Sequence, residues 1–119
     1  MKLKFVQLAK KIAQKSSSEF QLSCIITNKN RVVSIGWNEM SKSHPKSKTH
    51  SNHIHAEFHA LMNLPFEETR GTTAYVYRIK KNGSSGMAKS CPACRQALSI
   101  AGIKRVYYST DNSIEEEKL

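Results

Sequence analysis

The chain has 119 residues, of which 39% are hydrophobic and 8% aromatic, and this length suits one domain with its own core. No run approaches the ~20 apolar residues that cross a bilayer. The N-terminus is basic, but Lys10 and Lys11 interrupt its apolar residues, so it lacks the apolar segment of a signal peptide. We therefore expect a single domain over residues 1–119, with no membrane partner, and exclude the membrane and secreted classes.

Positive charge dominates the composition, with 19 Lys and Arg against 9 Asp and Glu and a net charge of +10. Four of the acidic residues gather near the C-terminus, at Asp111, Glu115, Glu116 and Glu117, so the rest of the chain is more basic still. This excess favours a polyanionic partner or a phosphorylated substrate. The alternative interpretation is that the positive charge serves only to keep the protein soluble.

Hydrophobic periodicity predicts an alternation of helices and strands. In chain order we expect helices at 3–15, 53–64 and 91–101, strands at 21–27, 31–37, 72–79 and 104–109, and a segment at 113–119 that pairs as a short strand or frays. Asn28-Lys29-Asn30 predicts a hairpin turn, and the polar residues 41–52 predict a long loop. This order indicates an α/β sandwich in which helices pack on a mixed sheet.

Three residues with metal-binding side chains stand at the start of two predicted helices: His55, Cys91 and Cys94. One imidazole and two thiolates suit a four-coordinate zinc that keeps one position for water. The i,i+3 spacing places both sulfurs on one helix face, and the helix N-terminus favours the thiolate. In a chain without a secretion signal, such cysteines indicate a reducing, cytoplasmic compartment and a metal or redox site rather than a disulfide.

Glu57 lies two residues after His55 in the same predicted helix. From there its carboxylate can approach a metal-bound water without being a ligand, take its proton and deliver it again. A purely structural zinc site has no need of this carboxylate. The sequence therefore indicates metal-assisted hydrolysis.

The motifs His55-Ala56-Glu57 and Cys91-Pro92-Ala93-Cys94 resemble the signature of the zinc-dependent cytidine/deoxycytidylate deaminase superfamily, H-x-E on one helix and P-C-x-x-C at the start of the next. The likeness covers nearly the whole chain and implies a three-layer α/β/α sandwich with a mixed sheet and the order αββαβαββ. It also implies that His55, Cys91 and Cys94 bind one Zn²⁺ and that Glu57 shuttles protons. This chain departs from the pattern in one place, because Ser90 precedes the first cysteine and Pro92 follows it.

The same resemblance implies a hydrolytic deaminase that converts cytosine to uracil and contacts its substrate through Asn38 and the backbone at Ala56 and Ser90. The basic charge favours a phosphorylated substrate, either a dCMP-type nucleotide or single-stranded nucleic acid, and the motif does not distinguish them. Three lysines of the polar loop are candidate phosphate contacts: Lys42, Lys46 and Lys48. The sequence leaves the oligomeric state open, and a homo-oligomer is among the states it allows.

Four other interpretations remain open. A non-catalytic, zinc-stabilised module for nucleic-acid binding would use the same ligands and the same basic surface. Cys91 and Cys94 alone would suit a redox dithiol. His59, one turn after His55, would close a structural zinc site. A second metal would use the loop histidines, namely His44, His50 and His53.

Overall fold

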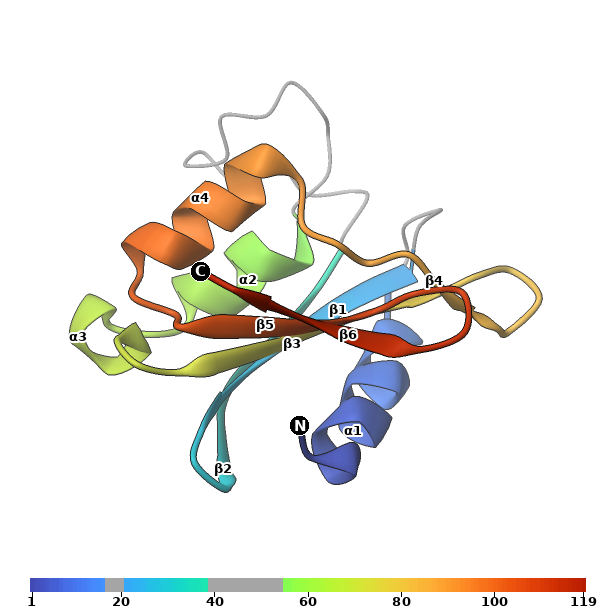
Figure 1. The fold of residues 1–119 in the computed structure, drawn as a ribbon, viewed down its shortest axis with the longest axis horizontal. Helices are drawn as coiled ribbons and strands as arrows, with labels where there is room; N and C mark the ends of the chain where they lie inside the picture. Colours follow the sequence, from blue (N-terminus) through green and yellow to red (C-terminus); the bar gives the residue numbers. More distant parts are fainter. Residues whose placement is uncertain (17–20, 39–54) are drawn as a thin grey trace.

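Helices cover both faces of one mixed sheet in the computed structural model, which describes residues 1–16, 21–38 and 55–119 (Figure 1). The helices are α1 (Leu3–Ala13), α2 (Ala56–Met62), α3 (Phe66–Thr69) and α4 (Pro92–Ile100). The strands are β1 (Gln21–Asn28), β2 (Arg31–Trp37), β3 (Thr73–Ile79), β4 (Ser85–Gly86), β5 (Arg105–Ser109) and β6 (Ile114–Lys118). Within the described ranges, no helix is long and apolar enough to cross a membrane.

The strands follow the order β2-β1-β3-β5-β6, with the short β4 paired to β3. The β3–β5 pair is parallel, and the chain between these two strands passes through α4. The β1–β2 hairpin closes where Asn28 pairs with Arg31, as the turn residues predict. β6 pairs antiparallel with β5, so the segment at 113–119 forms a strand and does not fray.

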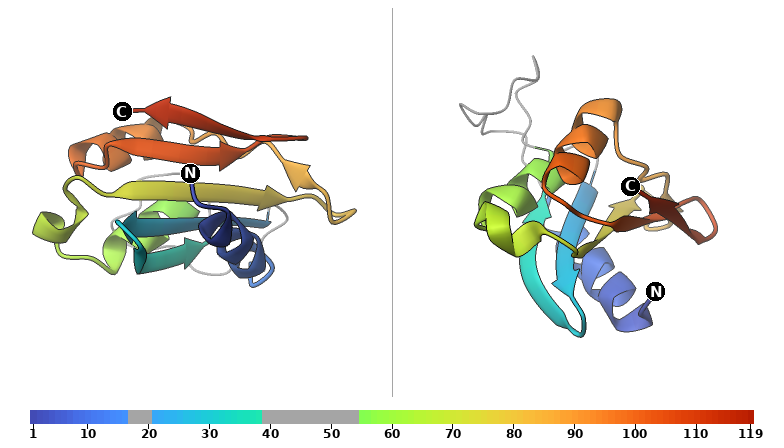
Figure 2. Two further views of the ribbon diagram at one scale, coloured as in Figure 1. Left: turned by 60° about the horizontal axis from the view of Figure 1, so that its bottom comes forward. Right: turned by 60° about the vertical axis from the view of Figure 1, so that its left-hand side comes forward.

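The central strands β1 and β3 are buried on both faces, and successive side chains along each strand point to opposite layers. On β3, Ala74 and Val76 face α2 and α4, whereas Tyr75 and Tyr77 pack against α1. In Figures 1 and 2, α1 lies on one side of the sheet and α2 and α4 lie on the other. The expected three-layer α/β/α sandwich is therefore confirmed.

Close packing between α2 and β2 fixes the start of α2. A Cβ placed on Gly36 of β2 would lie 2.5 Å from the carbonyl oxygen of Ala56 and would also overlap the backbone of Ala60. The helix presents only alanines at this contact, and the Ser34 hydroxyl donates a hydrogen bond of 2.6 Å to the Ala60 carbonyl. The backbone of α2 thus rests directly on the backbone of the sheet.

Three details differ from the sequence-based expectation. The helix expected at 53–64 runs from Ala56 to Met62, because Asn63 leaves the helical conformation shortly before Pro65. The four-residue α3 and the two-residue β4 were not expected, because such short elements carry no periodicity. The polar 41–52 loop, with Lys42, Lys46 and Lys48, lies outside the described residues.

Replacing Gly36 with Ala should lower the free energy of unfolding by about 3 kcal/mol, at the upper end for overpacking, because the obstructing atoms are backbone. Urea denaturation measures the change. Ser99→Ala, on the exposed face of α4, is the matched control and should stay within about 0.5 kcal/mol of wild type. A Gly36→Ala variant as stable as this control would contradict the packing described above.

Candidate active site

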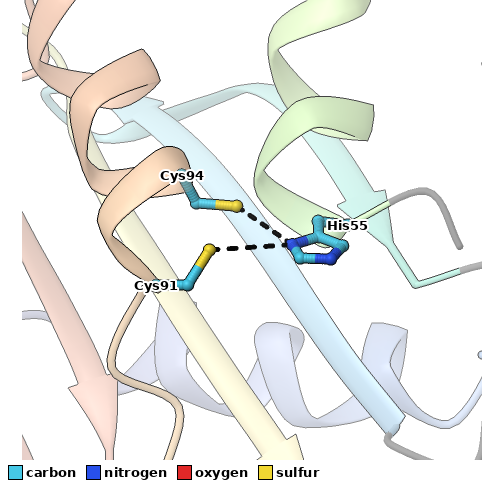
Figure 3. A group of neighbouring side chains, drawn as sticks. All are labelled: His55, Cys91 and Cys94. Carbon is cyan, nitrogen blue, oxygen red and sulfur yellow. Dashed lines mark hydrogen bonds between the residues drawn. The ribbon is translucent and has the colours of Figure 1, made fainter. Parts of the chain in front are cut away.

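His55, Cys91 and Cys94 converge from two helix N-termini, as Figure 3 shows. His55 immediately precedes α2, Cys91 immediately precedes α4, and Cys94 lies in the first turn of α4. The Nδ1 atom of His55 is 3.2 Å from the Cys94 Sγ and 3.9 Å from the Cys91 Sγ. The three candidate ligand atoms all lie within 4.8 Å of one another. The structure thus brings the three predicted ligands together, and their binding of zinc stays a prediction.

This donor set fits a zinc ion. Zinc–nitrogen and zinc–sulfur bonds of ~2.0 and ~2.3 Å in a tetrahedron separate the ligand atoms by about 3.5–3.8 Å, close to the spacing found. Burial raises the pKa of the Cys94 thiol well above its ordinary value, and the negative charge of Glu57 raises it further. The helix N-terminus alone therefore does not ionise Cys94, and a bound cation would supply the missing charge.

Pro92 explains why the departure from the family motif is compatible with this geometry. It occupies the first position of α4, directly after Cys91. Proline is favoured there, because its fixed φ suits the helix and its missing N–H would have no partner within the helix. The exchange of Ser90 and Pro92 relative to the motif thus keeps both cysteines at the N-terminus of α4.

Asn38 ties the end of β2 to the start of α2. Its side-chain Oδ1 accepts a hydrogen bond of 2.6 Å from the backbone N–H of Ala56, which is one of the helix-terminal groups without a partner in the helix. The Asn38 backbone N–H donates to the Leu22 carbonyl, and its carbonyl accepts a bond from Ser16. Asn38 therefore fixes the position of the residues on either side of Ala56.

Glu57 is buried, with 6% of its surface exposed, and lies in the first turn of α2. Glu57 lines the same cavity as His55 and Cys91. Glu57 therefore lies beside the His-Cys-Cys cluster.

A cavity of about 240 Å³ opens onto this cluster. The residues of its wall come from β1, the end of β2, the start of α2, β3 and the segment before α4: Leu22, Asn38, His55, Glu57, Arg78, Met87, Ala88, Lys89 and Cys91. A small molecule in this cavity would contact Glu57 and the cluster at once.

The other residues singled out in the sequence lie around this cavity or outside the described part. Ala56 is fully buried behind Asn38, and Ser90 lines a neighbouring depression beside Lys89. Their contacts with a substrate, like that of Asn38, stay predictions. His59 turns its Nδ1 to the backbone of Trp37, 3.1 Å away, and is not part of the cluster. The loop histidines and lysines, His44, His50, His53, Lys42, Lys46 and Lys48, lie outside the described residues.

Sequence reasoning missed Arg78 as a cavity residue. It lies on β3, and the alternation of this strand was recognised, but nothing in the sequence alone indicates which face the metal cluster occupies. The structure places Arg78 on that face, in the cavity wall.

Comparisons with known proteins agree with this site. The family model of the cytidine and deoxycytidylate deaminase zinc-binding region matches residues 1–110. The riboflavin biosynthesis protein RibD of Buchnera aphidicola is 36% identical over 107 residues, which are 90% of this chain and 25% of that protein. The deoxycytidylate deaminase of Mus musculus is 27% identical over 109 residues, covering 81% of this chain and 56% of that protein. The chain thus spans from a quarter to about half of the length of these relatives.

The fold also has a close counterpart among solved structures. The dCMP deaminase of the cyanophage S-TIM5, in complex with dCMP and dUMP, superposes with a TM-score of 0.66 at 20% sequence identity and covers 91% of this chain and 82% of that one. At this identity the likeness concerns the fold. Because the family model spans nearly the whole chain, the chain belongs to the cytidine and deoxycytidylate deaminase zinc-binding region family, and the His-Cys-Cys cluster lies within the matched residues.

Proposed function

We propose that this protein is a zinc-dependent hydrolytic deaminase that converts cytosine to uracil in a phosphorylated substrate. The reaction breaks the bond between C4 and the amino nitrogen, forms a bond from C4 to a water oxygen, and releases ammonia. His55, Cys91 and Cys94 hold the zinc, and Glu57 moves the protons. Asn38, together with the backbone at Ala56 and Ser90, contacts the base and sugar.

The observation that carries this proposal is that Glu57, His55 and Cys91 line one cavity. A bound zinc acts as a Lewis acid and lowers the pKa of water to about 7. Glu57 then has two tasks, to accept a proton from water and to deliver protons to the ring nitrogen and the leaving amine. Its burial excludes bulk water from this exchange and keeps the carboxylate in place.

The phosphorylated substrate class is supported by charge and by the relatives. The chain carries +10, which favours an anionic ligand. The cyanophage enzyme of the same fold was solved with dCMP and dUMP, and the mouse relative is named as a deoxycytidylate deaminase. These observations support a cytosine nucleotide, with single-stranded nucleic acid as the other phosphorylated candidate. The loop residues Lys42, Lys46 and Lys48 stay predicted phosphate contacts.

A non-catalytic zinc module for nucleic-acid binding is the second candidate, and the basic composition favours it. It would need the zinc ligands for stability and the positive surface for binding. It would not need Glu57, because burying a carboxylate beside the cluster lowers the stability of the fold and adds nothing to nucleic-acid binding. Glu57 therefore favours the enzyme.

Incubation of the zinc-loaded protein with dCMP, cytidine and a cytosine-containing single-stranded oligonucleotide tests the proposal. We expect uracil and an equal amount of ammonia from the phosphorylated substrates in preference to cytidine. Binding of the oligonucleotide without any uracil from any of the three would favour the non-catalytic module instead.

Elemental analysis should find one zinc per chain, and Cys94→Ala should abolish it. Removing zinc should also lower the melting temperature, by about 4 °C for each kcal/mol of stability lost, because metal binding is coupled to folding. Cys24→Ala is the matched control, since Cys24 is equally buried but lies outside the cluster, and it should keep its zinc. Retention of a full zinc equivalent by Cys94→Ala would refute the ligand set.

Replacing Glu57 with Gln should reduce kcat at least about 10²–10⁴-fold while zinc content and melting temperature stay near wild type. The amide matches the carboxylate in shape but cannot carry the proton. Glu68→Gln makes the same chemical change at an exposed position of α3 and should retain full activity. Substantial turnover by Glu57→Gln would rule out the proton-transfer role.

A further inference from the structure

Arg78 lies in the cavity wall, and the alternation of β3 places it there. Ala74 and Val76 belong to the buried cluster beneath α2 and α4, and Arg78 is the next residue of that series. Its side chain therefore leaves the sheet on the same face as the His-Cys-Cys cluster. Arg78 and Glu57 therefore line the same cavity.

Hydrogen bonds hold the backbone of Arg78 in position. Its N–H donates to the Ser109 hydroxyl at 3.0 Å, and that hydroxyl donates to the Gly86 carbonyl at 2.7 Å. Gly86, in β4, is also the pairing partner of Arg78 across the β3–β4 ladder. The short strand β4 thus fixes the end of β3 from which the arginine side chain emerges.

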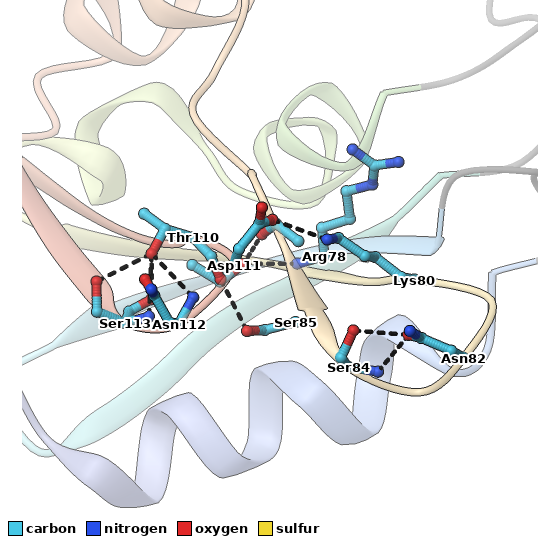
Figure 4. A network of polar contacts seen from close by, with 11 residues as sticks. Arg78, Lys80, Asn82, Ser84, Ser85, Thr110, Asp111, Asn112 and Ser113 are labelled. Carbon is cyan, nitrogen blue, oxygen red and sulfur yellow. Dashed lines mark hydrogen bonds and ion pairs between the residues drawn. The ribbon is translucent and has the colours of Figure 1, made fainter.

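The side chain itself packs on the glycine backbone. A Cβ added to Gly86 would lie 3.1 Å from Arg78 Cδ and 3.3 Å from Nε, so a side chain at position 86 would press on the arginine stem. In Figure 4 the stem extends away from the ion pair of Lys80 and Asp111. The stem of Arg78 therefore packs closely against β4 on one side.

Lys89 is the other cation of the wall, but it is placed differently. Its side chain is 53% exposed, and its Nζ lies 3.8 Å from the Glu117 carboxylate on β6. Arg78 emerges from the sheet inside the cavity, and its planar fork of N–H donors matches the oxygens of a phosphate. The cavity, at about 240 Å³, has room for one small ligand.

We infer that Arg78 binds the phosphate of a mononucleotide and thereby sets the preference for a dCMP-type nucleotide over the nucleoside. This inference rests on the proposed function, because it assumes a nucleotide substrate whose base lies at Glu57 and assigns the binding of its phosphate to Arg78. It makes Arg78 a specificity-determining residue of the cavity.

The test compares the zinc-loaded wild type with three zinc-loaded variants, Arg78→Gln, Arg78→Lys and Lys80→Gln. For each protein, kcat/KM is measured for dCMP and for deoxycytidine. The Kd values for dUMP and for deoxyuridine are measured by calorimetry. Arg78→Gln should lose about 10–100-fold more for each phosphorylated compound than for its nucleoside. Arg78→Lys should recover part of the loss, since it keeps the charge but not the fork. Lys80→Gln removes the same charge two residues away, outside the cavity wall, and should keep the wild-type preference. Thermal unfolding checks that each variant is folded.

The outcomes separate this inference from the proposed function. Deamination with an unchanged phosphate preference in Arg78→Gln would overturn the inference and leave the function standing. Absence of deamination with dUMP binding that still depends on Arg78 would overturn the function and support the phosphate site. A wild-type protein that does not distinguish dUMP from deoxyuridine, or that deaminates only the oligonucleotide, would overturn the inference.

Discussion

The direct contact between the backbones of α2 and β2 is the constraint on which the site depends. Gly36 leaves no side chain between them, and the small residues Ala56 and Ala60 let the helix settle on the strand. The side chain of Asn38 then accepts a hydrogen bond from the Ala56 N–H, the first of the helix. This bond fixes the backbone from which the side chains of His55 and Glu57 extend, on either side of Ala56. The positions of His55 and Glu57 thus depend on the lack of a side chain at Gly36, which lets α2 pack directly on β2.

The second half of the site comes from the parallel pairing of β3 and β5. The chain between them passes through α4, whose N-terminus brings Cys91 and Cys94 to His55. Burial raises the pKa of Cys94, so its thiol keeps its proton until a cation takes the proton's place. Zinc binding would therefore be coupled to proton release and to folding, and fold stability and the proposed chemistry would share one metal.

Much of this could be predicted from the sequence, for identifiable reasons. The helix and strand periods revealed the main elements, and the chemistry of His55, Glu57, Cys91 and Cys94 revealed the cluster, because soft ligands at fixed spacing are rare by chance. Arg78 was not found, since its role depends on which face of β3 the cluster occupies. β4 was missed because two residues show no pattern, although its Gly86 packs against the arginine stem. The end of α2 was misplaced by two residues, where Pro65 limits its length.

The most direct test of the account is deamination of dCMP by the zinc-loaded protein in water enriched in ¹⁸O, with the product examined by mass spectrometry. The account predicts dUMP that is two mass units heavier than in ordinary water, with the label on C4 and one ammonia released for each dUMP formed. Recovery of unchanged dCMP from a fully zinc-loaded, folded protein, under conditions in which an established dCMP deaminase completes the reaction, would contradict it.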